Sequence, residues 1–222
     1  SLLIKFFSGN IRSVKLKKNI IASFLIKGLS IIIGFIMIPL CLDYLDQTRY
    51  GIWLTISSFL VWLSFFEIGL GSGLQNRLAE ALTMKDYEKA RIYVSTTYVT
   101  LTIVSFILCF VTILIGKFID WTKVFNTDPN LQSDITILVN MIFAIFFIQL
   151  VLKLISTILY ADQSPAVANL IAPIGNSIAL IMIYILKETT PGSLIYLGVT
   201  LSLSPILVML IFSIVLFSGT YK

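Results

Sequence analysis

Residues 49–80 read RYGIWLTISSFLVWLSFFEIGLGSGLQNRLAE, an apolar span that contains one carboxylate and, just after it, glycines at alternate positions. A carboxylate that faces lipid inside a membrane costs roughly 2.5 kcal/mol or more, so Glu67 is expected to face protein or water. Gly69, Gly71 and Gly73 leave room for a close helix approach or a bend, which makes them hinge candidates. The stretch predicts a membrane-spanning helix whose charged and glycine-rich part has a functional role.

The composition is typical of an integral membrane protein. Of the 222 residues, 58% are hydrophobic and 12% are charged, and the mean hydropathy is +0.98. Histidine is absent, which removes the commonest general base and metal ligand and every Ser/His or Cys/His catalytic pair. The two cysteines, Cys41 and Cys109, lack CxxC spacing and are interpreted as buried thiols. We therefore expect a protein that is not an enzyme and that needs no metal and no cofactor.

Six apolar stretches are each long enough to cross a bilayer as a helix, which takes about 20 residues. Polar segments with Gly, Pro, Asn and Asp separate them, as turns require. The predicted fold is an all-α integral membrane protein, a bundle of six transmembrane helices over residues 19–217. A basic amphipathic segment, 1–18, precedes the bundle and is expected on an anionic membrane surface or as a solvated tail, and residues 218–222 follow. The predicted spans are 19–42, 51–74, 92–115, 134–160, 166–186 and 194–217.

The basic residues outside the spans favour one orientation in the membrane. With a cytoplasmic N-terminus most Lys and Arg residues lie on the cytoplasmic side, as the positive-inside rule requires. The polar segment 76–91 is then a cytoplasmic elbow on the membrane surface, with Asp86 placed to cap the helix of the third span. Ten basic residues are cytoplasmic in this orientation, namely Lys5, Arg12, Lys15, Lys17, Lys18, Arg77, Lys85, Lys89, Arg91 and Lys222, and four lie outside, namely Arg49, Lys117, Lys123 and Lys187.

Three ionisable residues, Lys27, Glu67 and Lys153, fall inside the predicted spans. Each lies seven or eight residues from the predicted cytoplasmic end of its span, which at 1.5 Å per residue is a depth on the order of 11 Å. The three could share one layer, in which Glu67 pairs with Lys27 or binds a coupling proton or sodium ion. We favour the pair because it needs fewer assumptions. Either lysine could instead extend to the membrane surface.

Polar or small side chains recur on one face of several spans, as expected of helices that line a bundle interior or a water-filled cavity. In the second span Trp62 and Glu67 fall on different faces, so the span is polar on two sides or is reoriented at its glycines. Pro39, inside the first span, is a further hinge candidate or a tolerated proline. The stripes are Asn19, Ser23, Lys27, Ser30 and Gly34; Tyr98, Thr102, Ser105, Cys109, Thr112 and Gly116; Gln149, Lys153, Ser156 and Tyr160; and Asn169, Pro173, Asn176 and Tyr184.

Residues 18–82, KNIIASFLIKGLSIIIGFIMIPLCLDYLDQTRYGIWLTISSFLVWLSFFEIGLGSGLQNRLAEAL, resemble the N-terminal end of Wzx-type O-antigen and polysaccharide flippases. These belong to the multidrug/oligosaccharidyl-lipid/polysaccharide (MOP) exporter superfamily, which has a MATE-like fold. The family usually has aspartate at the position of Glu67 and a basic residue near Gln75. Its members have twelve or more membrane helices in two lobes, so the resemblance implies that these six spans form one lobe and that the C-terminal lobe is its partner.

The resemblance implies a transporter that moves an undecaprenyl-pyrophosphate-linked oligosaccharide from the cytoplasmic to the outer leaflet by alternating access. Such a protein lies in the bacterial inner membrane, serves O-antigen, lipopolysaccharide or other surface polysaccharide export, and contacts membrane lipids but no nucleic acid. Lysine ammonium groups are strong point charges for a pyrophosphate. An aromatic ring can stack on sugars, and amide groups suit a cargo rich in hydroxyls. The cavity candidates are therefore Lys27, Lys153, Trp62, Gln149 and Asn176.

Three other functions compete with this reading. A MATE-type multidrug or cation antiporter of the same fold would need an acidic cavity, whereas the spans contain two lysines and one glutamate. A membrane enzyme or a scaffold is a second alternative, but no nucleophile and base form a recognisable motif. A channel is the third, and no filter-like loop or ring of charges is present in the sequence.

Overall fold

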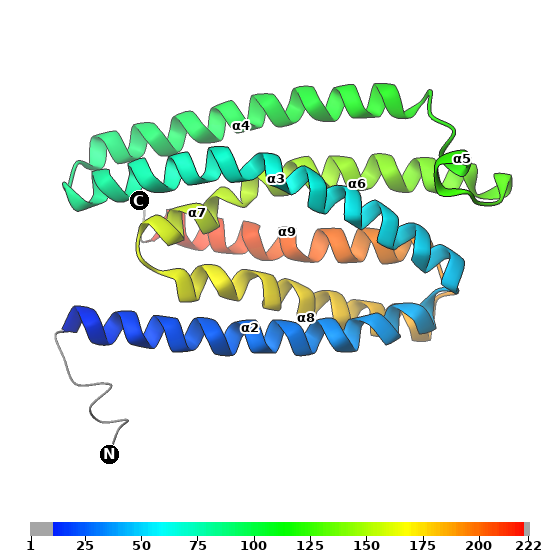
Figure 1. The fold of residues 1–222 in the computed structure, drawn as a ribbon, viewed down its shortest axis with the longest axis horizontal. Coiled ribbons are helices and arrows are strands. Elements are labelled where there is room, and N and C mark those ends of the chain that lie inside the picture. The colour runs from blue at the N-terminus through cyan, green and yellow to red at the C-terminus, as the bar shows by residue number, and fades with distance from the viewer. Residues whose placement is uncertain (1–10, 220–222) are drawn as a thin grey trace, which may run out of the picture.

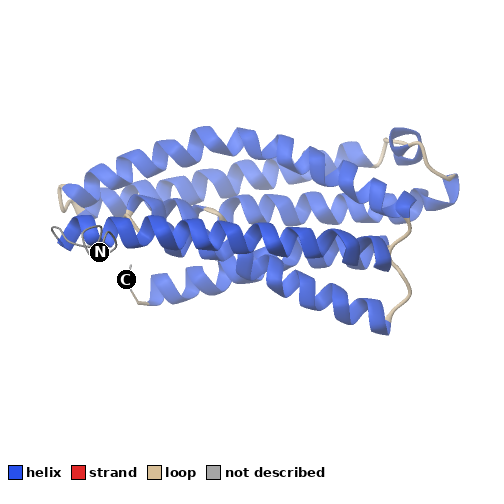
Figure 2. Cartoon of the chain, turned by 60° about the horizontal axis from the view of Figure 1, so that its bottom comes forward, coloured by secondary structure: helices blue, strands red, loops and turns tan. Residues whose placement is uncertain are grey.

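The structure, a computed structural model, describes residues 11–219, without the side chains of residues 11–20, 63 and 65–70. Residues 1–10 of the predicted basic segment and residues 220–222 lie outside the described residues. Throughout the described range the chain forms helices and no strands (Figures 1 and 2). The helices are α2 (Ile11–Tyr44), α3 (Gln47–Thr83), α4 (Tyr87–Gly116), α5 (Trp121–Phe125), the 3₁₀ helix η1 (Pro129–Leu131), α6 (Gln132–Leu152), α7 (Leu154–Ala161), α8 (Pro165–Thr189) and α9 (Leu194–Ser218).

An all-α membrane fold is confirmed. Within the described residues, five helical segments are long and apolar enough to cross a membrane. The remaining predicted span, 51–74, lies within α3, which includes residues whose side chains are not described. The five segments are Ile21–Tyr44, Tyr87–Gly116, Pro129–Ala161, Pro165–Thr189 and Leu194–Ser218.

The long helices run side by side and define two ends of the bundle (Figure 1). The α2–α3, α4–α6 and α8–α9 connections lie at one end, here called the Asp46 end. The α3–α4 and α7–α8 connections lie at the other, here called the Asp86 end. Helix α2 packs on α8 rather than on its chain neighbour α3, and Figure 1 shows α2 and α3 separating away from their connection.

Two apolar clusters hold the helices together, one toward each end. The cluster toward the Asp46 end includes Ile52 and Ile142, and the cluster toward the Asp86 end includes Leu78 and Ile155. Glycines allow two close crossings within this frame. A Cβ atom added at Gly198 would lie 2.6 Å from Leu138 Cδ1, and one at Gly175 would lie 2.8 Å from Pro205 Cα.

The segment 76–91 differs from the predicted surface elbow. Helix α3 continues to Thr83, because NRLAEAL is a run of good helix formers, and the chain then reverses within three residues. The predicted cap of the next helix is confirmed, since the Asp86 carboxylate accepts a hydrogen bond from the Lys89 backbone N–H at 3.1 Å. Helices α3 and α4 therefore form a continuous antiparallel hairpin.

The fourth span is interrupted where the sequence predicts one helix. Helix α6 ends at Leu152 and α7 begins at Leu154, so Lys153 lies at the junction. At this point the Ser156 N–H donates to the Lys153 carbonyl oxygen at 2.9 Å, a tight three-residue turn. Neither proline nor glycine marks the break in the sequence.

The hinge candidates lie in unbroken helices. Helix α2 is continuous through Pro39, and α3 is continuous through Gly69, Gly71 and Gly73. A Cβ atom at Gly71 would meet Thr157 Oγ1 at an ordinary 3.7 Å, and one at Gly73 would meet no atom within 4 Å. Bending at these positions stays a prediction.

Candidate functional site

A pocket of about 140 Å³ lies between α3 and α6 and contains two of the predicted site residues, Gln149 and Lys153. Ser64 is its third polar lining residue. Among the described lining residues Lys153 alone carries a charge, and its side chain is half-buried at the junction of α6 and α7. The apolar lining consists of Leu60, Val61, Phe146 and Leu150.

Helical periodicity explains why these residues meet. Phe146, Gln149, Leu150 and Lys153 follow the spacing i, i+3, i+4, i+7, which places them on one face of the helix. The predicted stripe containing Gln149 and Lys153 thus faces α3. The Ser64 hydroxyl donates to the Leu60 carbonyl oxygen at 2.9 Å, so it is already bonded within its own helix.

A second polar group joins three helices at the half of the bundle toward the Asp86 end. The Tyr160 hydroxyl on α7 donates to Asn169 Oδ1 on α8 at 2.8 Å. The Asn169 amide then donates to Ser23 Oγ on α2 at 3.1 Å. These three residues come from three of the predicted polar stripes, so the helical spacing of polar residues was the signal that placed them on inward faces.

The structure does not place all cavity candidates in the pocket. Lys27 is exposed on α2, one helical turn beyond Ser23. Trp62 is 76% exposed on α3 and is not a lining residue. Asn176 is half-buried on α8, two turns after Asn169.

Glu67 lies in α3, and its side chain is outside the described residues. Its pairing with Lys27 and its alternative role as a proton or sodium site therefore stay predictions. Among the described side chains, no cluster of His, Cys, Asp and Glu could hold a metal ion.

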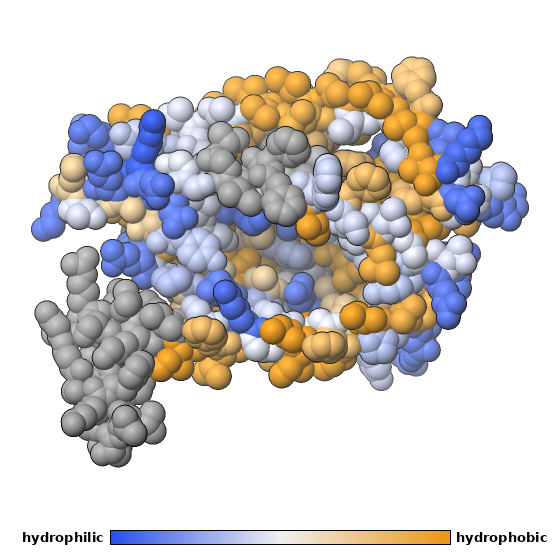
Figure 3. Space-filling view, in the orientation of Figure 1, coloured by the Kyte–Doolittle hydropathy of each residue, from blue (hydrophilic) through white to orange (hydrophobic). Residues whose placement is uncertain are grey.

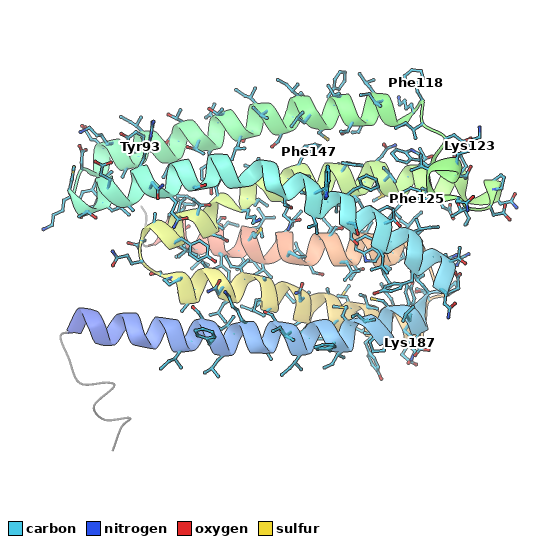
Figure 4. All side chains as sticks on the ribbon, in the orientation of Figure 1. Tyr93, Phe118, Lys123, Phe125, Phe147 and Lys187 are labelled. Atoms are coloured by element: carbon cyan, nitrogen blue, oxygen red, sulfur yellow. The ribbon has the colours of Figure 1, made fainter. Side chains whose placement is uncertain are left out.

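The Asp46 end is closed by contacts between residues far apart in the chain. Arg49 Nη1 donates to the Gly192 carbonyl oxygen at 2.9 Å, and the Tyr44 hydroxyl donates to the Pro191 carbonyl oxygen at 3.3 Å. Lys187 forms an ion pair with Asp43 (Figure 4 labels Lys187). The α2–α3 connection is thereby tied to the α8–α9 connection.

These features define a multi-pass membrane protein with a polar site among its helices, and the comparisons with known proteins give its family. The MatE family model matches residues 20–185, well over half of the chain. The chain therefore belongs to the MatE family, which is a family of MOP-type membrane transporters and not of enzymes. No curated protein and no solved structure matches the chain.

Proposed function

We propose that this MatE-family chain moves a lipid-linked oligosaccharide, with an undecaprenyl-pyrophosphate carrier, across a bacterial inner membrane by alternating access. The observation that carries the proposal is Lys153, a half-buried lysine in the pocket between α3 and α6 and the one ionisable lining residue among those described. A half-buried ammonium group is screened less than a surface one, so it attracts a phosphate and repels an organic cation.

The size of the pocket restricts the part of the substrate that enters it. A volume of about 140 Å³ is smaller than the roughly 300–1,000 Å³ of pockets that enclose a drug-sized ligand. The pocket suits a phosphate-sized group beside the start of an apolar chain, because Ser64, Gln149 and Lys153 supply polar contacts and the other lining residues are apolar.

The sugars would lie outside this pocket, on the face between α2 and α3. Figure 3 shows hydrophilic side chains gathered on that face between the apolar rims of the bundle. Lys27 and Trp62 are both exposed, which leaves a cation and a large ring available to the cargo. Amide and hydroxyl groups from Asn169 and Tyr160 add donors and acceptors.

The closed Asp46 end supports alternating access. The α2–α3 connection is tied to the α8–α9 connection there, and α2 and α3 diverge toward the Asp86 end. The distribution of basic residues predicts that the Asp86 end is cytoplasmic. A substrate made in the cytoplasm would then enter at the Asp86 end.

The test is transport by the protein reconstituted in vesicles with a fluorescent lipid-linked oligosaccharide, measured as protection from a membrane-impermeant reductant. Lys153→Glu should slow transport about tenfold or more, equal to roughly 1.4 kcal/mol, because it repels the pyrophosphate. Lys153→Arg should keep most of the activity.

Arg91→Glu is the matched control, since it makes the same charge change at an exposed position of α4. Equal transport by Lys153→Glu and wild type would contradict the proposal. If the wild-type protein moves no lipid-linked oligosaccharide but exports an organic cation, and Lys153→Glu increases that export, the protein is a multidrug or cation antiporter.

A further inference from the structure

The corner between α4 and α5 presents a large apolar side chain to its surroundings. Phe118, two residues after the end of α4, is 89% exposed. Its backbone N–H donates to the Ile115 carbonyl oxygen at 3.0 Å, so the last turn of the helix fixes its position. The exposed phenyl ring presents a large apolar surface.

The ring points outward because another aromatic residue occupies the inner side of the corner. Trp121 donates its indole N–H to the Gly116 carbonyl oxygen at 3.1 Å and stacks on Phe125 with 6.0 Å between ring centroids. Thr122 is buried, and its backbone N–H donates to Gln132 Oε1 at 3.0 Å. The corner is therefore a fixed structure.

Phe118 continues the exposed apolar face of α4. Leu114 and Ile115, one turn earlier, are both exposed on a helix long and apolar enough to cross a membrane. In Figure 4 the Phe118 side chain projects to the same side as the outward side chains of α4. Figure 3 shows the apolar band along α4 reaching the charged residues of the Asp46 end.

A basic residue directly precedes Phe118 in the chain. Lys117 is exposed and, among the described residues, forms no ion pair. Lys123, by contrast, pairs with Asp120 at 3.1 Å. Exposed aromatic and basic residues at the end of an apolar helix are typical of the level at which a membrane helix meets the headgroup layer.

We propose that residues 114–118 form a binding site for a membrane phospholipid. The Phe118 ring lies among the upper acyl carbons, and the Lys117 ammonium contacts the headgroup phosphate. The site is independent of the transported substrate, and it fixes the level of the bilayer surface at the Asp46 end.

The experiment places the photoreactive residue p-benzoylphenylalanine at position 118 of the full chain. The protein is reconstituted in vesicles of phosphatidylethanolamine and phosphatidylglycerol, illuminated and examined by mass spectrometry. Phospholipid adducts are expected at position 118. The same residue at position 130, exposed on η1, should give none.

A further substitution tests the headgroup contact. In the position-118 photoprobe protein, Lys117→Gln should lower the yield of phosphatidylglycerol adducts about five-fold, whereas Lys123→Gln should leave it unchanged. An unchanged yield with Lys117→Gln would overturn the headgroup contact. Equal adducts at positions 118 and 130, no adduct at 118, or a cross-link from 118 to protein would overturn the site.

The wild-type chain allows an independent measurement that requires no amino-acid substitution. A membrane-impermeant amine reagent should label Lys117 more slowly in vesicles than in phospholipid-free detergent, while Lys123 is labelled equally in both. Equal labelling of Lys117 in the two media would also overturn the site.

Discussion

The two ends of the bundle use polar side chains in opposite ways. At the Asp46 end, Arg49, Tyr44 and the Lys187–Asp43 pair bind the two connections to each other. At the half toward the Asp86 end, Lys153 lines a pocket and Lys27 is exposed on α2. At the Asp46 end the polar side chains thus connect segments distant in the chain, whereas Lys153, with Gln149, lines a pocket between two helix faces.

The largest expected effect is on transport and concerns the layer of charges toward the Asp86 end. Lys27→Glu and Glu67→Lys should each abolish export of surface polysaccharide in cells, because each leaves two like charges within the membrane. The double variant should restore export, since it reverses a pair, and Glu67→Gln should retain it. Wild-type export by Lys27→Ala and Glu67→Ala would remove both residues from the mechanism.

If Glu67→Gln abolishes export and the double variant fails to restore it, Glu67 acts as a proton or sodium site rather than as a partner of Lys27. The two accounts thus differ in the outcomes of two variants, Glu67→Gln and the double variant. Expression at the membrane, measured by immunoblot, serves as the control for each.

The next largest effect concerns closure of the Asp46 end. A Cβ atom at Gly192 would lie 2.3 Å from the Tyr44 carbonyl oxygen, so Gly192→Ala must push the two connections apart. We expect a loss of about 1–3 kcal/mol, measured by thermal unfolding in detergent. Gly28→Ala is the matched control, because a Cβ atom there meets nothing within 4 Å. If the two variants unfold at the same temperature, the Asp46 end is not tightly closed at Gly192.

A smaller effect is expected from the polar group that joins α7, α8 and α2. Asn169→Ala removes both of its hydrogen bonds, to Tyr160 and to Ser23, and should lower the free energy of unfolding by about 1 kcal/mol. Tyr160→Phe removes one of them and should cost less. Chemical denaturation in mixed micelles is a suitable measurement, and Asn130→Ala, at an exposed position, is the control. Equal free energies of unfolding for Asn169→Ala and wild type would show that the hydrogen bonds of Asn169 add no net stability.

The smallest effect is a pH dependence at the α4–α5 corner. The Thr122 hydroxyl, which donates to Asp120 at 2.7 Å, and Lys123 lower the pKa of the Asp120 carboxyl from its ordinary value. Because the pKa is lower in the folded protein, the ionised Asp120 stabilises the corner fully above its pKa in the unfolded chain, about 4. This stabilisation is lost as the pH falls through the pKa of Asp120 in the folded protein. The measurement is Trp121 fluorescence in a variant with Trp53 and Trp62 replaced by phenylalanine. This variant should show an acid transition, and the added substitution Asp120→Asn should remove it. If the transition persists with Asp120→Asn, a group other than Asp120 causes it.

Local periodicity was enough to predict the helices, the cap at Asp86 and the shared face of Gln149 and Lys153. These features depend on residues within a few turns of one another. The break at Lys153 could not be predicted, because VLKLIS contains no helix breaker. Leu154 and Ile155 are buried in the cluster toward the Asp86 end, so packing against distant helices accompanies the break.

The exposure of individual side chains and the long-range contacts that close the Asp46 end also could not be predicted from the sequence. Trp62 is 76% exposed and lies outside the pocket between α3 and α6, so its contact with the cargo stays a prediction. Periodicity could not give this placement, since an apolar ring on a membrane helix suits a lipid-facing or an inward position equally. The bond from Arg49 to Gly192 joins residues 143 positions apart. The Pro191-Gly192 pair predicts a turn, but no local pattern identifies what the turn meets.

The Arg49 guanidinium binds a main-chain oxygen, and this has a consequence for evolution. Every amino acid supplies that oxygen, so the bond places no demand on the side chains of the α8–α9 connection. The close approach of Tyr44 places a strict demand at one position, because no side chain fits at Gly192. In homologous proteins that keep this closure, position 192 should remain glycine.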